Sequence, residues 1–170
     1  MKTLNYSKME KSDEMRILNY DEMKKLDKCI EVKEDELEEI AILAKEMIQK
    51  CVKNGGIGLA APQVGINKKM FVFSFDNGVT FHIVINPFWA PKENKITKSL
   101  EQCLSLEEKE TYYVERKKYI LAQYYGISSD KTHLVKVNKN FRGEPAIIFQ
   151  HEYDHLKEIS IKDKGKKLNG

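Results

Sequence analysis

Hydrophobic residues recur at three- and four-residue steps between residues 35 and 54, which is the spacing of one helical face. The positions on this face are Leu37, Ile40, Ala41, Ala44, Met47, Ile48 and Cys51. Asp35 and Glu38 have the spacing of a capping box at the start, and Asn54-Gly55 supplies a stop signal. The pattern predicts one long amphipathic helix in the N-terminal part of the chain.

The pattern then changes to two strand-like runs, at residues 70–75 and 79–85, on either side of Asn77-Gly78. Such a pair of residues between two apolar runs predicts an antiparallel hairpin with a tight two-residue turn. Pro87 and Pro91 follow, and we expect them to break the chain after the hairpin.

The C-terminal half contains shorter strand-like runs and one further helical segment. Strands are predicted at residues 95–100, 112–116, 119–125 and 132–137, and a helix is predicted to begin near Pro145 and carry residues 146–156. The first turn of this helix is apolar on all sides, so we expect the helix to be buried. Because helices and strands do not alternate regularly, the sequence predicts an α+β fold, with antiparallel sheets packed around the buried helix.

Length and composition are those of a single globular domain. The chain has 170 residues, of which 41% are hydrophobic and 32% charged, and a chain of this length buries roughly 70% of its unfolded surface. Residues 1–14 are polar and are predicted to form a flexible extension, which leaves residues 15–170 as the domain. The net charge of +3 is small for a nucleic-acid-binding protein, and no run approaches the ~20 apolar residues of a membrane span.

The cysteine pattern indicates a reducing compartment. Cys29, Cys51 and Cys103 are an odd number at wide spacings, and residues 1–14 lack the apolar core of a secretory signal. The sequence therefore predicts free thiols and a cytoplasmic location.

The clearest chemical signal is the segment of residues 151–155. His151 and His155 lie four positions apart, so on a helix both imidazoles project from one face and can reach one metal ion. Glu152 directly follows the first histidine, where it can take a proton from a water molecule at that metal. Asp154 is predicted either to accept a hydrogen bond from a residue of this site or to form a salt bridge in contact with solvent. The alternative is a surface helix end that holds two histidines by chance.

Two histidines leave a catalytic metal site one protein ligand short. His82 lies in the middle of a predicted strand, and His133 is expected to be exposed after a turn. Cys29 and Cys51 occupy core-like positions. Cys103 follows a short strand, where a thiolate can point into a cleft, so it is favoured as third ligand, with a glutamate as the open alternative.

A glycine-rich segment at residues 55–65 is the third candidate. It superficially matches a dinucleotide fingerprint, but it follows a helix rather than a strand and contains Pro62, so that interpretation is weak. Glycines also let another chain approach closely, so the segment can instead pair its peptide groups with an extended ligand. Gln63 is its one side-chain donor. A plain glycine-rich turn with a surface glutamine is the alternative.

Taken together, the three segments resemble the peptide deformylase family. Residues 56–63 are similar to its motif Gly-apolar-Gly-apolar-Ala-Ala-x-Gln, residues 101–105 to Glu-Gly-Cys-Leu-Ser, and residues 150–155 to Gln-His-Glu-x-Asp-His. The resemblance covers about residues 16–160 and points to the shorter subgroups, which lack a long C-terminal helix. Gln102 departs from the family pattern, which has a glycine before the cysteine.

The resemblance implies an enzyme that removes the formyl group from the N-terminal methionine of new polypeptides, and the ribosome is a predicted partner. It implies one divalent ion per chain, natively Fe²⁺ with Zn²⁺ or Ni²⁺ as substitutes. Cys103, His151 and His155 would be its ligands, Glu152 the general acid and base, and Gln63 with the Leu104 amide the oxyanion donors. Ile57, Gly58 and Arg116 would contact the substrate.

Substrate choice is expected to depend on a methionine-sized pocket. Ile147 and Ile148 lie four and three residues before His151, so they flank the same helical face. Two rival functions stay open. One is a zinc endopeptidase, and the other is a deformylase-like protein that binds peptide ends with weak or no turnover, a possibility that Gln102 keeps open.

Overall fold

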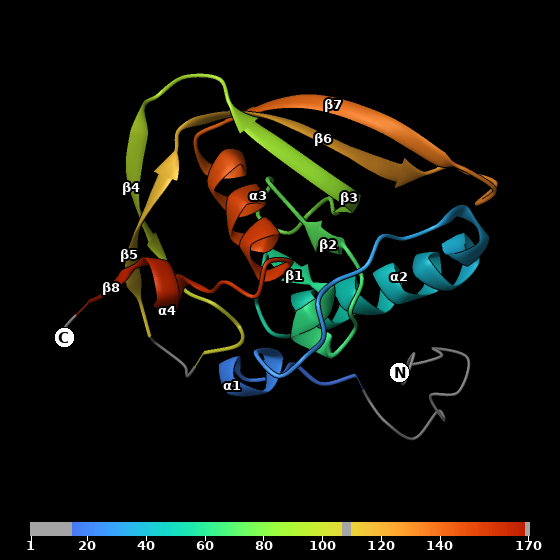
Figure 1. Ribbon diagram of the computed structural model, residues 1–170, viewed down its shortest axis with the longest axis horizontal. Coiled ribbons are helices and arrows are strands. Elements are labelled where there is room, and N and C mark those ends of the chain that lie inside the picture. Colours follow the sequence, from blue (N-terminus) through green and yellow to red (C-terminus); the bar gives the residue numbers. More distant parts are fainter. Residues whose placement is uncertain (1–14, 107–109, 169–170) are drawn as a thin grey trace.

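The protein is described by a computed structural model, which covers residues 15–106 and 110–168. The predicted extension of residues 1–14 lies outside the described residues. The fold is mixed α and β with two antiparallel sheets (Figure 1). The larger sheet has the order β1 (Gly58–Ala60), β2 (Met70–Phe73), β3 (His82–Pro91), β6 (Tyr119–Ile127) and β7 (Leu134–Arg142). The smaller has the order β4 (Ile96–Glu101), β5 (Tyr112–Lys117) and β8 (Lys166–Lys167).

Six helical segments complete the described chain. These are α1 (Tyr20–Met23), a 3₁₀ turn (Glu34–Glu36), α2 (Leu37–Lys53), a second 3₁₀ turn (Ala61–Val64), α3 (Glu144–His155) and α4 (Ile161–Lys164). Strands and helices therefore lie close to the positions expected from the hydrophobic pattern. In the part of the chain that is described, no helix combines the length and the apolar character that crossing a membrane requires.

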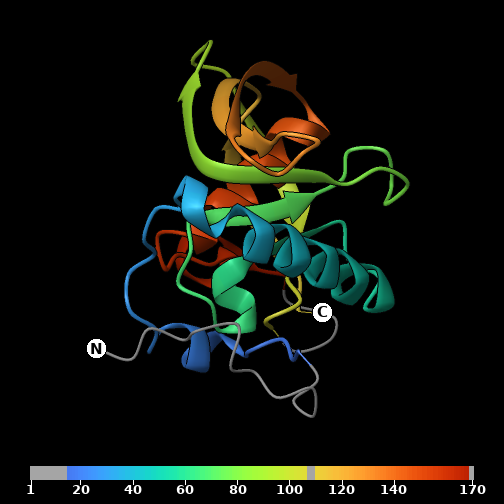
Figure 2. The same cartoon turned by 90° about the vertical axis from the view of Figure 1, so that its right-hand side faces the viewer.

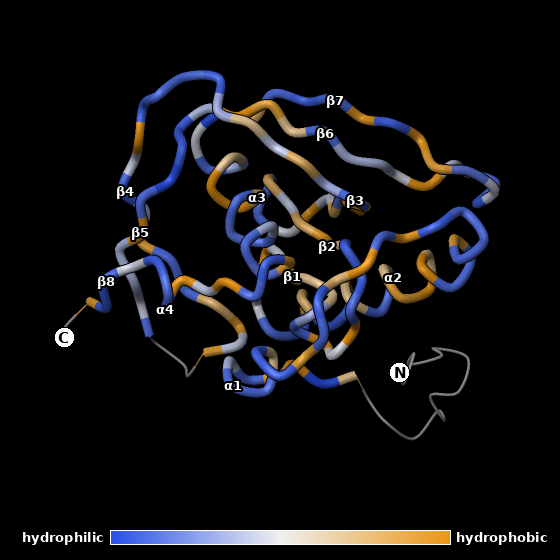
Figure 3. The backbone as a smooth tube through the Cα atoms, in the orientation of Figure 1, coloured by the Kyte–Doolittle hydropathy of each residue, from blue (hydrophilic) through white to orange (hydrophobic). Residues whose placement is uncertain are grey.

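Both faces of the larger sheet are covered, and β2 shows this most clearly. Met70 and Val72 pack in the hydrophobic cluster that includes α2, whereas Phe71 and Phe73 pack with Phe149 of α3 in a second cluster. Successive side chains of a strand point to opposite faces, so α2 and α3 lie on opposite sides of this sheet (Figure 2). The most hydrophobic segments accordingly run through the centre of the molecule (Figure 3). With hydrophobic clusters packed on both faces of the sheet, α3 is held in place beside the edge strand β1.

The start of α2 differs from the prediction. The capping box expected between Asp35 and Glu38 is wrong, because the short 3₁₀ turn precedes the helix. The Glu36 carboxylate instead accepts a hydrogen bond of 2.9 Å from the Lys33 backbone N–H. The buried face of α2 still consists of residues at helical spacing, namely Leu37, Ile40, Leu43, Ala44, Met47 and Cys51.

The loop between β2 and β3 is longer than expected. The antiparallel pairing of these strands is confirmed, but the tight two-residue turn is wrong, since residues 74–81 lie outside both strands. Ser74 Oγ accepts a hydrogen bond of 2.9 Å from the Gly78 N–H, and Asp76 Oδ1 accepts one of 2.8 Å from the Thr80 N–H. These side chains accept hydrogen bonds from backbone N–H groups that strand pairing would otherwise use, so the pairing of β2 with β3 stops before the loop.

Pro87 does not break the chain as expected. Strand β3 continues through Pro87 and ends at Pro91, with a register shift on the way. Asn86 takes a φ of 48° there, and its side chain exchanges two hydrogen bonds of 2.9 Å with the Val32 backbone. A bulge leaves one residue of a strand outside the ladder of backbone hydrogen bonds. Because proline has no backbone N–H, it can lie at such a position without the loss of a ladder hydrogen bond.

Candidate active site

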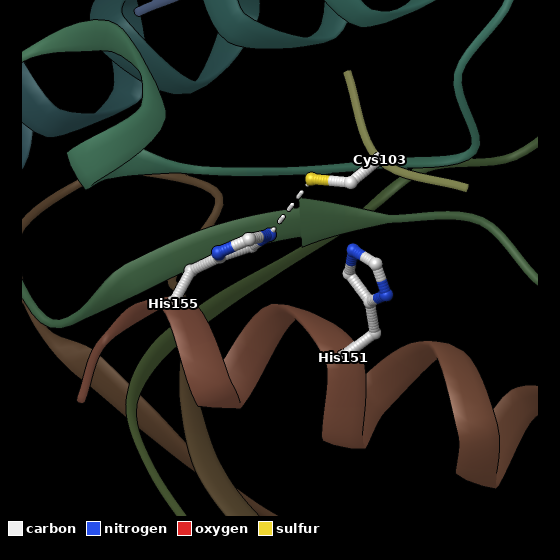
Figure 4. A group of neighbouring side chains, drawn as sticks. All are labelled: Cys103, His151 and His155. Atoms are coloured by element: carbon white, nitrogen blue, oxygen red, sulfur yellow. Dashed lines mark hydrogen bonds between the residues drawn. The ribbon is translucent and has the colours of Figure 1, made fainter. Parts of the chain in front are cut away.

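Helix α3 and the turn after β4 bring three donor side chains together. His151 and His155 project from one face of α3, and their ring centroids are 5.0 Å apart. Cys103 approaches from the opposite side, with Sγ 3.4 Å from His155 Nε2 (Figure 4). One ligand atom from each of the three residues lies within 4.8 Å of the other two. This spacing allows all three to bind one cation.

The chemistry of these donors fits a transition-metal ion. Thiolate and imidazole are typical ligands of zinc and iron. His151 Nδ1 lies 2.9 Å from a carboxylate oxygen of Glu101, which leaves Nε2 free on the side of the other two donors. A carboxylate behind a histidine ligand fixes the orientation of its ring. Sequence analysis did not single out Glu101 for this role, although it stands two residues before Cys103.

Electrostatics favour the thiolate form of Cys103. Burial opposes ionisation of the thiol, but His155 and His151 beside it hold its pKa well below the usual range. Burial also acts against a positive charge on His151, whereas hydrogen bonds with Cys103 and Glu101 raise its pKa to about 10. The thiolate is the form of cysteine that binds metals, so the protein groups alone prepare this sulfur as a ligand.

Glu152 lies next to these donors as a buried carboxyl group. Burial raises its pKa to about 7, and its Oε2 has no hydrogen-bond partner among the described residues. Gly58 of β1 packs directly against it, since a Cβ added at Gly58 would lie 2.7 Å from the Glu152 carboxyl carbon. A carboxyl group with a pKa near neutrality is suited to general acid and base catalysis.

Gln63 and Leu104 carry N–H groups beside Cys103. Gln63 is buried in the second 3₁₀ turn, where its Oε1 accepts a hydrogen bond of 2.9 Å from the Ala60 N–H. This bond turns Nε2 toward Ser105 Oγ, at 3.1 Å, and toward Cys103 Sγ, at 3.5 Å. The Leu104 backbone N–H has no bonding partner within residues 15–106 and 110–168. Two donors of this kind can stabilise an oxygen atom that gains negative charge.

A cavity of about 1180 Å³ opens beside these groups. Its walls come from the segment before β1, from β4 and the turn after it, and from α3. The predicted site residues along it are Ile57, Gly58, Gln63, Cys103, Leu104, Ile147, Ile148, His151 and Glu152. On α3 it extends from Glu152 to Glu144, which is about 12 Å at 1.5 Å per residue. This length corresponds to roughly three residues of an extended peptide.

The prediction that Arg116 contacts substrate is wrong. Its side chain is 1% exposed and does not line the cavity. The guanidinium donates two hydrogen bonds of 2.8 Å to Glu101 and one of 2.5 Å to Asp154. Asp154 also pairs with Lys164 at 2.9 Å, so its salt bridge is buried rather than solvated. Arg116 therefore holds the carboxylate that orients His151.

The other histidines and cysteines do not join this group of donors, although burial and the nearby carboxyl group of Glu152 both raise the pKa of the Cys51 thiol. His82 is partly buried and stacks on Phe75, with ring centroids 4.7 Å apart, and His133 is exposed. Burial raises the pKa of Cys29 to about 11 and that of Cys51 to about 12. These two thiols therefore behave as hydrophobic side chains, and all three cysteines are free.

Comparison with known proteins identifies relatives along most of the chain. A family model described as polypeptide deformylase matches residues 14–169. Peptide deformylase 2 of Bacillus anthracis is 36% identical over 129 residues, which cover 73% of this chain and 67% of that protein. The peptide deformylase of Thermotoga neapolitana is 37% identical over 122 residues, which cover 71% of this chain and 68% of that protein.

Solved structures agree with these relatives. The crystal structure of peptide deformylase from Thermotoga maritima matches with a TM-score of 0.76 and 30% identity, covering 89% of this chain and 97% of that one. The actinonin-bound class I type b peptide deformylase from Acinetobacter baumannii matches with a TM-score of 0.76 and 28% identity, covering 87% and 95%. The resemblance found in the three motifs is thus confirmed along nearly the whole chain, which belongs to the polypeptide deformylase family.

Proposed function

We propose that this chain removes the formyl group from N-terminal formylmethionine with Cys103, His151 and His155 as the ligands of one divalent ion. Glu152 is the general acid and base of the reaction. The observation that carries the proposal is the convergence of three donor atoms within 4.8 Å, beside a buried carboxyl group on the wall of a peptide-sized cavity. Metal-dependent deformylation is the activity of the family to which the chain belongs.

The ligand set is one sulfur and two nitrogens, which suits ferrous iron and zinc. We propose ferrous iron as the native ion, with zinc or nickel as substitutes, following the family resemblance. A divalent ion in such a site lowers the pKa of a bound water from about 15.7 to about 7. Glu101 and Arg116 keep the His151 ring in the orientation that this ligation needs.

The proton steps belong to Glu152. Its carboxylate takes a proton from the attacking water as the water oxygen bonds to the formyl carbon. The carbon–nitrogen bond then breaks, and Glu152 returns the proton to the departing amine, so the products are formate and a free N-terminus. Gln63 Nε2 and the Leu104 N–H donate to the formyl oxygen as it becomes negative. Each such donor is worth about 3 kcal/mol of transition-state stabilisation.

The substrate peptide is expected to bind as an added strand. Among the described strands, β1 is at the edge of its sheet with β2 as its one neighbour, and Ile57 and Gly58 line the cavity. An extended peptide can therefore pair with the backbone of this segment. Ile147 and Ile148 on the opposite wall then flank the methionine side chain, next to His151.

The free thiols of Cys29, Cys51 and Cys103 support a reducing compartment, so we place the reaction in the cytoplasm. Contact with the ribosome stays a prediction from the family resemblance.

Protein prepared without oxygen and incubated with formyl-Met-Ala-Ser tests the proposed function. The expected result is stoichiometric formate and free peptide amine, with about one divalent ion per chain by elemental analysis. An unformylated peptide with an internal methionine is the control and stays intact. Cleavage of that control would support a zinc endopeptidase instead, and tight binding of the formyl peptide without turnover would support a protein that only binds peptide ends.

Gly58→Ala is expected to lower kcat for formyl-Met-Ala-Ser about 100-fold. The new Cβ would lie 2.7 Å from the Glu152 carboxyl carbon, so the carboxylate must move, and a displacement of about 1 Å can cost this much. Steady-state kinetics measures the effect. Gly126→Ala is the matched control, because a Cβ there meets nothing within 4 Å. A kcat for Gly58→Ala within twofold of the wild type would contradict the proposed packing against Glu152.

Arg116→Leu is expected to lower the free energy of unfolding by about 3–5 kcal/mol, because it removes the guanidinium that two buried carboxylates share and leaves Glu101 with His151 and Asp154 with Lys164. Urea denaturation measures this loss, and Arg142→Leu, at a side chain that is 61% exposed, is the control. Unchanged stability together with a raised KM would instead return Arg116 to a role in substrate binding.

A further inference from the structure

Gln102 and Thr111 close the base of the loop that carries Cys103 and Leu104. The backbone ladder between β4 and β5 ends at the pair Glu101 and Tyr112, so Gln102 and Thr111 are the next residues outward. Gln102 Nε2 donates a hydrogen bond of 3.1 Å to Thr111 Oγ1. A side-chain bond thus continues the strand pairing one step beyond the last backbone pair.

The loop is attached at a second point, through Ser105. Its carbonyl oxygen accepts a hydrogen bond of 3.0 Å from the Tyr20 N–H, and its hydroxyl accepts one of 3.1 Å from Gln63 Nε2. Cys103 and Leu104 therefore lie between two attachments, one at residue 102 and one at residue 105. Of the two, the bond between Gln102 and Thr111 lies one step beyond the last backbone pair of β4 and β5, and Thr111 is itself held on its other side, where its carbonyl oxygen accepts a hydrogen bond of 2.8 Å from the Leu168 N–H.

The Gln102 side chain is accommodated without backbone strain. Its φ is not among the positive values, which in the described non-glycine residues occur at Asn77, Asn86, Lys131 and Glu158. Gln102 is exposed on the cavity wall, where Thr111 also lies, and its amide is tied to that hydroxyl. A glutamine in place of the family glycine therefore needs no left-handed backbone at this turn.

We propose that Gln102 is a positioning residue, whose bond to Thr111 holds Cys103 Sγ and the Leu104 N–H in place for the reaction. The inference rests on the proposed function. Preorganised donors accelerate a reaction because they need no rearrangement as charge develops. A single hydrogen bond shifts an equilibrium by roughly 2- to 10-fold, so its loss shifts the equilibrium between the productive and the displaced positions of the loop toward the displaced one by this factor.

The test compares Gln102→Ala, Thr111→Val, the double variant and Thr111→Ser in the full-length protein. We expect Gln102→Ala and Thr111→Val each to lower kcat by roughly 3- to 10-fold with KM within twofold of the wild type. Thr111→Ser keeps the hydroxyl and should keep the wild-type kcat. Thr111 has further interactions, so the double variant is decisive. It should lose no more than the single variants if both act through one bond.

Amide hydrogen exchange at Leu106, whose N–H donates a hydrogen bond of 3.0 Å to the Cys103 carbonyl oxygen, gives a readout that does not depend on activity. Exchange at this position should become roughly 3- to 10-fold faster in Gln102→Ala and Thr111→Val, with or without metal, and should stay unchanged in Thr111→Ser. Additive losses in the double variant, or wild-type exchange and kcat in Gln102→Ala, would overturn the proposal. An inactive wild-type protein would instead overturn the proposed function, while the exchange data would still show whether the bond holds the loop.

Discussion

Glu152→Gln is expected to abolish deformylation while the metal content stays unchanged. Glutamine has nearly the same size, so it fits the buried position beside Gly58, but it cannot accept and return a proton at this site. General acid and base catalysis contributes about 10²- to 10⁴-fold, and kcat/KM for a formyl-Met peptide should fall by this factor. The rate is measured by formate release and the metal by elemental analysis.

Glu39→Gln is the matched control, since Glu39 is an exposed residue of α2 on the far side of the sheet from α3. It should leave both rate and metal content unchanged. A Glu152→Gln protein that turns over at close to the wild-type rate would show that another group moves the proton.

Cys103→Ser is expected to lose the metal rather than only the activity. Serine puts a neutral hydroxyl where the surrounding histidines hold a thiolate, so two imidazoles remain as strong donors. Mutation of a residue that hydrogen-bonds to a metal ligand lowers the metal affinity by about 10- to 100-fold. We expect loss of the ligand itself to lower the affinity by more than this. Competition with a metal chelator, followed by elemental analysis, measures the affinity.

Cys29→Ser is the control for this variant, because burial keeps the Cys29 thiol protonated away from the site. Its metal content should equal that of the wild type. If Cys103→Ser protein retained the wild-type affinity, the third ligand would have to be another residue, such as the glutamate left open by the sequence.

The relation between sequence and site is clearest for α3. The two histidines were identified because four-residue spacing places them on one helical face, and the cavity-lining positions Ile147 and Ile148 follow from the same geometry. Cys103 was a weaker inference from spacing alone, since the sequence contains no measure of the distance in space across the 47 residues between it and His151. The comparison of its three motifs with a known family supplied what spacing lacked.

Arg116 shows where this reasoning failed. Its position after the second motif indicated substrate contact, but its side chain points to the inner face of β5, where Glu101 and Asp154 surround it. The direction of a strand residue depends on the register of the pairing, and a shift by one residue reverses it. The contact between Glu101 and His151 could not be predicted for the same reason, because it too depends on the strand register.

By itself, the sequence determined the two long helices α2 and α3, most strands, the paired histidines with their glutamate, and the family. These features depend on local periodicity or on motifs of a few residues, so they can be recognised without knowing how the chain folds back. Only the tertiary structure decided which side chains stand behind the metal ligands, how Gln102 is tied to Thr111, and how β3 continues past Pro87. Each of these depends on strand register or on contacts between distant segments, because hydrogen bonds and ion pairs act over a few ångströms in space regardless of separation along the chain.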